Sequence, residues 1–174
     1  LTEDRKKGKK IFSLLLKYIE KFNKDLQYSL DICIALRPQI NELATEKERS
    51  FFSKLMPNSN LIFKENIAVE FSTYRAIDQS KIAITHYSTA AFDSLYLDTK
   101  VLFCQFYEYP KFPLPKELTY KVESSKYIEF KAALNQLLSM DMGLYKQSIK
   151  HDIHYFNKLD LKNLPQDVVR SALF

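Results

Sequence analysis

The amino-acid sequence predicts an α/β fold built on an open, doubly wound parallel sheet. Short apolar runs rich in branched residues alternate with segments in which apolar residues recur at helical spacing. Parallel neighbours need crossover connections, so this alternation is typical of a parallel sheet with helices on both faces. The 174 residues, 46% hydrophobic and 27% charged, are enough for one domain with its own core.

The first half of the chain predicts three helices and two strands. Residues 9–26 form the first helix, because Phe12, Leu15, Leu16, Ile19, Phe22 and Leu26 are spaced for one face. The run "LDICIAL" (30–36) predicts a buried strand that ends before Arg37-Pro38. A helix over 41–56 ends at "PNSN", and "NLIFKE" (60–65) predicts the second strand. A short helix over 72–79 follows, with Ser72 or Thr73 as its cap.

The second half continues the alternation. We expect strands over 81–85 and 100–106, separated by a helix over 88–98 in which Ala91 and Leu95 share a face. The proline-rich stretch over 107–117 predicts an irregular loop, and "LTYKV" (118–122) a fifth strand. Ser124 or Ser125 is expected to cap the next helix, and one or two further helices follow from Gly143.

Cysteine, histidine and charge usage narrow the class of protein. Cys33 and Cys104 lie in apolar runs, so we expect buried free thiols and a reducing compartment. The three histidines show no zinc spacing with cysteine, so we expect no metal site.

The net charge is +5, with a basic run over residues 5–10 that is typical of a solvated helix face or a linker. We expect no nucleic-acid partner, since aromatic and basic residues do not interleave on a predicted strand. No apolar run is long enough to cross a membrane, and contact with an anionic membrane surface stays open.

The most informative stretch is "ITHYSTAAFDSL" (84–95), in which a strand runs into a Ser-Thr pair that opens a helix. Ligands of open α/β sheets bind outside the carboxyl ends of the strands, here after Leu36, Ile84 and Phe106. Thr85, Ser88 and Thr89 could bind a phosphate through their hydroxyl groups and the unpaired backbone N–H groups of the helix. Ser88 could equally be an ordinary N-cap, and local sequence alone favours that reading.

Three further residues complete the candidate site. Asp93 lies one helical turn after Thr89 and could accept hydrogen bonds from ribose hydroxyls, or be a solvated helix position. His86 is the candidate catalytic residue, because it could donate to a phosphate or act as a general acid; its alternative is a structural hydrogen-bonding role. Arg37 could clamp a diphosphate, or form a surface ion pair.

The stretch "AIDQSKIAITHYSTAAFDSLYLDTKVLFCQFYEY" resembles the nucleotide-binding carboxyl-terminal half of glycosyltransferases with the two-domain GT-B fold. It is most similar to the branch containing CDP-glycerol glycerophosphotransferases and bacterial capsule or surface-carbohydrate enzymes. In that branch a strand ends in Thr-Asp-Tyr-Ser-Ser, an Asp follows four residues later, and a strand of the type "KPVIFY" comes next. Thr85, Tyr87, Ser88, Thr89, Asp93 and residues 100–103 fall on this pattern, with His86 in place of the family's Asp. Arg37-Pro38 stands where the family commonly has His-Pro.

The resemblance implies a Rossmann-like domain that forms one half of a GT-B fold. Its domains would be a leading helix and basic segment (1–29), a nucleotide-binding domain (30–142) and a C-terminal helical tail packed on it (143–174). Ser88 and Thr89 would contact the diphosphate of a nucleotide-activated sugar or CDP-glycerol, which is a substrate and not a cofactor. Asp93 would meet the ribose or the glycerol-phosphate end.

The same resemblance implies a cytoplasmic enzyme, with contact at the inner face of the membrane left open. The chain starts at Leu1, followed by a charged stretch, and we expect a fragment cut at a domain edge, inactive alone, whose amino-terminal partner domain holds the acceptor site. Two alternatives remain open: a non-catalytic α/β interaction domain fused to a transferase, and a sugar-nucleotide epimerase of the same fold.

Overall fold

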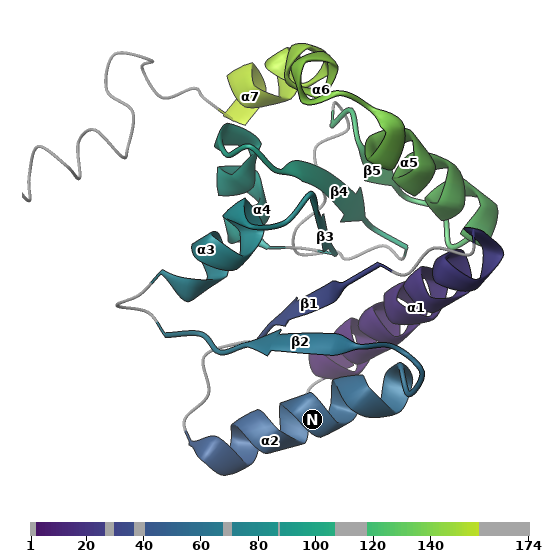
Figure 1. Ribbon diagram of the computed structural model, residues 1–174, viewed down its shortest axis with the longest axis vertical. Helices are drawn as coiled ribbons and strands as arrows, with labels where there is room; N and C mark the ends of the chain where they lie inside the picture. The colour runs from purple at the N-terminus through teal and green to yellow at the C-terminus, as the bar shows by residue number, and fades with distance from the viewer. Residues whose placement is uncertain are drawn as a thin grey trace, which may run out of the picture.

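Parallel strands joined by helices form two small sheets, which confirms the predicted α/β class (Figure 1). The computed structural model describes residues 3–26, 30–36, 41–67, 71–86, 88–106 and 118–156. Within these ranges every observed strand pair is parallel, as the crossover argument predicts.

The first sheet pairs β1 (Ile32–Ala35) with β2 (Leu61–Lys64), with Ile32 opposite Leu61. The crossover helix α2 (Glu42–Leu55) joins them and begins one residue after the expected start, because Asn41 is its N-cap and accepts a hydrogen bond from the Ala44 amide. The long helix α1 (Glu3–Leu26) packs beside α2, with the rings of Phe12 and Phe52 edge to face at 6.4 Å. The first βαβ unit is therefore in place.

Burial on the first sheet differs from the prediction. Cys33, expected to be buried, is exposed, and along β1 only Ile32 is buried, whereas Cys33 and Ala35 are exposed. The expectation of a strand buried on both faces is therefore wrong for β1. On α1 the buried face includes Ile11 while Phe12 is 39% exposed, so the helix is turned slightly from its expected orientation.

The second sheet has the order β3-β4-β5, with β3 (Ile82–Thr85) and β5 (Lys121–Val122) on either side of β4 (Lys100–Cys104). All five residues of β4 are buried, as expected of a central strand. The short helix α3 (Ser72–Asp78) precedes β3. Its N-cap is Phe71 and not Ser72 or Thr73, because Ser72 uses its hydroxyl to accept from the Ile67 amide.

The connection from β3 to β4 is shorter in α-helix than predicted. The expected helix over 88–98 is α-helical only as α4 (Thr89–Asp93) and continues as the 3₁₀ turn η2 (Ser94–Tyr96). Ala91 and Leu95 are both buried, which confirms that they share the core-facing side. At this point the Ser94 hydroxyl donates to the Ala90 carbonyl. A side-chain bond of this kind competes with the backbone hydrogen bonds that would continue the α-helix.

Helix α5 (Tyr127–Ser139) covers β4 and β5 and also packs on α1. Its N-cap is Lys126, so the expected cap at Ser124 or Ser125 is wrong; the Ser124 hydroxyl instead accepts from the Lys126 amide. Phe130, Leu134 and Leu137 form its buried face, as the helical spacing predicts.

Two helices follow, as predicted for the region after Gly143: α6 (Met142–Ser148) and α7 (Lys150–Phe156). The Tyr145 hydroxyl of α6 accepts a hydrogen bond from the Val101 amide of β4 at 2.9 Å. Asp152 of α7 accepts from the amide and the hydroxyl of Thr119, each at 3.0 Å. These helices are thereby fixed to the second sheet.

The two sheets share a hydrophobic core but do not pair with each other in the described part of the chain. In Figure 1 the arrows of β1 and β2 point to the left, whereas the arrow of β4 points to the right. The carboxyl ends of the strands therefore form two separate edges, and each edge is a candidate binding region.

Candidate functional site

His86 joins the carboxyl ends of β3 and β4. It follows the last residue of β3, is only 7% exposed, and its Nδ1 lies 3.0 Å from the carbonyl oxygen of Cys104, the last residue of β4. Since a carbonyl can only accept, Nδ1–H donates in this contact. The histidine therefore fixes the relative position of two strand ends at the predicted site.

Burial lowers the pKa of His86 below its ordinary value of 6.5, and the hydrogen bond to the Cys104 carbonyl opposes this shift only in part. A general acid must carry the proton it donates, so a lowered pKa works against that role at neutral pH. The geometry favours a neutral, hydrogen-bonded imidazole at the strand ends.

Ser88 lies at the N-cap position of α4 in an extended conformation, with φ −148° and ψ 131°. Its side chain makes no capping hydrogen bond, although its backbone carbonyl accepts from the Ala91 amide at 3.1 Å. The local reading of Ser88 as an ordinary capping side chain is therefore not what this structure shows. Because α4 has five residues, the helix dipole adds little, and any anion here would depend on hydroxyl and backbone N–H groups.

The structure gives the backbone positions of three further predicted residues, and two others lie outside the described residues. Thr85 ends β3 and is half-buried, and Thr89 and Asp93 are the first and last residues of α4. One strand-turn-helix segment therefore carries five of the predicted site residues: Thr85, His86, Ser88, Thr89 and Asp93. Arg37 lies outside the described residues, as does Tyr87.

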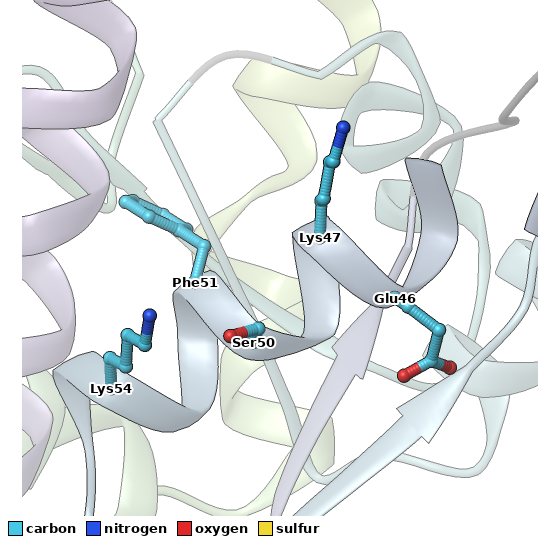
Figure 2. A pocket seen from close by; sticks show the side chains of 5 residues that line it. All are labelled: Glu46, Lys47, Ser50, Phe51 and Lys54. Atoms are coloured by element: carbon cyan, nitrogen blue, oxygen red, sulfur yellow. The ribbon is translucent and has the colours of Figure 1, made fainter. Parts of the chain in front are cut away.

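Two cavities lie elsewhere, along α2. The first, about 520 Å³, is lined by Glu46, Lys47, Ser50, Phe51 and Lys54. Figure 2 shows that these side chains come from one helix and diverge, with Phe51 pointing toward α1 and Glu46 pointing away from Phe51. Lys9 of α1 lies over the Phe51 ring, 5.4 Å from its centre. This hollow is a helix surface, and its lining does not include Ser88 or His86.

The second cavity, about 420 Å³, lies at the carboxyl ends of β1 and β2. Leu36 directly follows β1, Glu65 and Asn66 directly follow β2, and Asn41, Thr45 and Arg49 line it from α2. The sequence singles out the position after Leu36, but not Arg49 or Glu65. The sequence signal that could have identified Glu65 is its place as the last residue of the expected strand over 60–65, at its carboxyl end.

Arg49 organises this second cavity. Its guanidinium nitrogens donate to Glu46, at 3.1 Å, and to Glu65, so the arginine links α2 to the end of β2. Its Nε is buried and has no hydrogen-bond partner. The side-chain amide nitrogen of Asn66, which also lines the cavity, donates to the Thr73 hydroxyl at 3.2 Å, and this bond holds the Asn66 side chain in place.

Within the described ranges, no group of three or more His, Cys, Asp and Glu side chains is arranged to hold a metal ion. None of the described helices combines the length and apolar character needed to cross a membrane. No protein-family model, curated protein or solved structure matches the chain.

Proposed function

We propose that this chain is the donor-binding domain of a glycosyltransferase or glycerophosphotransferase that uses a nucleotide-diphosphate donor in bacterial surface-polysaccharide synthesis. In this proposal the α/β unit is Rossmann-like and forms one half of a GT-B fold. The observation that carries the proposal is Ser88: it stands at the carboxyl end of β3, yet its hydroxyl does not cap α4.

The proposed contacts follow the order of residues along the turn. Ser88 and Thr89 bind the diphosphate, with backbone N–H groups of the first turn of α4 assisting. Asp93, one turn further, accepts hydrogen bonds from the ribose or from the glycerol-phosphate end. Arg37, which follows Leu36 in the sequence, lies outside the described residues and is not among these proposed contacts.

His86 has a positioning role in this proposal. By donating to Cys104 at 3.0 Å it aligns the ends of β3 and β4, which sets where the Ser88 turn begins. Burial lowers the pKa of His86 and so favours the neutral ring, which brings no full positive charge to the diphosphate.

A non-catalytic α/β interaction domain is the second candidate. The observation that favours it is that burial lowers the pKa of His86, which works against its predicted role as a general acid. Under this reading the turn would bind no nucleotide.

Calorimetric titration with CDP, UDP, GDP and CMP-sugar donors separates the two candidates. One of these ligands should bind, and Ser88→Ala should weaken it about ten- to hundredfold, because a charge-assisted hydrogen bond contributes roughly 1.5–3 kcal/mol. Asp93→Asn should weaken a donor that contains ribose, while Ser53→Ala, at an exposed position on α2, serves as the matched control. Failure of all four ligands to bind, or equal affinity in Ser88→Ala, would contradict the proposal.

A further inference from the structure

The cavity at the carboxyl ends of β1 and β2 lies on a different sheet from Ser88 and His86. At about 420 Å³ it falls within the range of pockets that hold small molecules. It also occupies the region of a parallel βαβ unit where open α/β sheets bind ligands. A site here is therefore separate from the proposed donor site and goes beyond it.

The charges that line the cavity disfavour an anionic ligand. Three carboxylates, from Glu42, Glu46 and Glu65, face one guanidinium, from Arg49. Glu42 also lies in the first turn of α2, where its charge already offsets the partial positive charge of the helix end. A phosphate or diphosphate would meet net negative charge.

The hydrogen-bonding groups favour a ligand that both donates and accepts. The Thr45 hydroxyl donates to the Asn41 backbone carbonyl, and the Asn66 amide nitrogen donates to Thr73. These two donors are engaged within the protein, whereas the buried Nε–H of Arg49 has no partner. The carboxylate oxygens have several acceptor positions each. Hydroxyl groups are the donors that complement such a lining without adding charge.

A cationic ligand is less well matched than a neutral one. Arg49 already pairs with Glu46 and Glu65, so two of the three carboxylates have a cationic partner. A second cation would also lie close to the guanidinium. Leu36 and Ile67 give the cavity an apolar portion suited to the C–H face of a sugar ring.

We propose that this cavity binds a neutral, polyhydroxylated ligand, a carbohydrate or polyol group, with Glu65 accepting from its hydroxyls and Arg49 holding Glu65 in place. The ion pair between Arg49 and Glu65 fixes the carboxylate before the ligand arrives, which lowers the entropy lost on binding.

The test is an NMR titration of the ¹⁵N-labelled chain with D-glucose, N-acetylglucosamine, D-ribose and glycerol. At least one should shift amide signals within residues 41–49 and 64–67. Glu65→Gln should weaken that ligand about tenfold, since it removes a charged acceptor. Glu129→Gln, which changes an equally charged side chain paired with Lys126 on α5, should leave it unchanged.

Thermal unfolding of each variant checks that the fold persists. If Glu65→Gln unfolds, Glu42→Gln tests the same point at an exposed side chain of the cavity and should also weaken the sugar. The proposal is overturned if no compound in the panel shifts these amides. It is also overturned if UDP or ethylenediamine shifts them while sugars do not, or if Glu129→Gln weakens binding as much as Glu65→Gln. Shifts caused by UDP in residues 85–94 report on the donor site, so the two proposals can fail separately.

Discussion

The imidazole of His86 donates from Nδ1 to the carbonyl oxygen of Cys104 across 3.0 Å, and so joins the ends of two neighbouring parallel strands. Regular pairing holds Thr85 opposite Phe103, one residue before this contact. The side chain therefore extends the alignment of β3 and β4 beyond their last ladder pair, at the start of the Ser88 turn.

This contact predicts an acid-dependent loss of stability. Because burial lowers the pKa of His86 in the folded state, the unfolded chain binds a proton more readily. The stability contributed by the neutral ring is fully present above about pH 6.5 and falls as the pH drops from there through the folded-state pKa. Urea unfolding at pH 7.5 and pH 5.5 measures it, and His86→Gln should reduce the difference between the two pH values. An unchanged difference in that variant would assign the acid sensitivity to other groups.

The buried hydrogen bond between Tyr145 and Val101 predicts that removing the Tyr145 hydroxyl lowers the stability of the fold. Its hydroxyl is the acceptor for the buried Val101 amide, so Tyr145→Phe leaves that amide without its partner. We expect a loss of about 1–3 kcal/mol in the free energy of unfolding. Tyr127→Phe is the matched control: it removes a bond to Asp25 on an exposed surface, at 2.9 Å, and should cost less. Equal losses in urea denaturation would contradict the role of burial.

Lys100 predicts that a buried ammonium group stabilises the end of α5. The side chain is 8% exposed and donates to the carbonyls of Leu137, at 2.7 Å, and Met140. Lys100→Met should lower the free energy of unfolding by roughly 1–3 kcal/mol, because two helix-end carbonyls lose a charged donor. Lys146→Met, which removes an exposed ion pair with Asp98, should cost about 1 kcal/mol or less. Chemical denaturation of both variants compares them, and a larger loss for Lys146→Met would refute the assignment.

The two cysteines should differ in reactivity. Cys33 is exposed, whereas Cys104 is completely buried and burial raises its pKa. A thiol reagent should therefore modify Cys33 in the native chain and Cys104 only after unfolding. Mass spectrometry of the labelled peptides distinguishes the two, with Cys33→Ser as the control that should abolish native labelling. Rapid native labelling of Cys104 would show that β4 is not the buried central strand.

Helix and strand positions followed closely from the sequence where the apolar spacing was regular. α2 begins one residue after the expected start because Asn41 caps it, and α5 buries the face that Phe130, Leu134 and Leu137 define. The caps at Ser72 and Ser124 were predicted wrongly for one reason. Both hydroxyls accept hydrogen bonds from nearby loop amides, a competition that local sequence does not resolve.

The sequence alone determined the order of chemical groups at the candidate site. Its local periodicity predicts a strand, a turn and a helix, and along this segment lie Thr85, His86, Ser88, Thr89 and Asp93. Only the tertiary structure decided that His86 meets Cys104, that Arg49 meets Glu65, and that Cys33 is exposed. These contacts join residues distant in sequence, or depend on which face of a sheet another element covers. Pairing and packing set them, and a one-dimensional pattern carries neither.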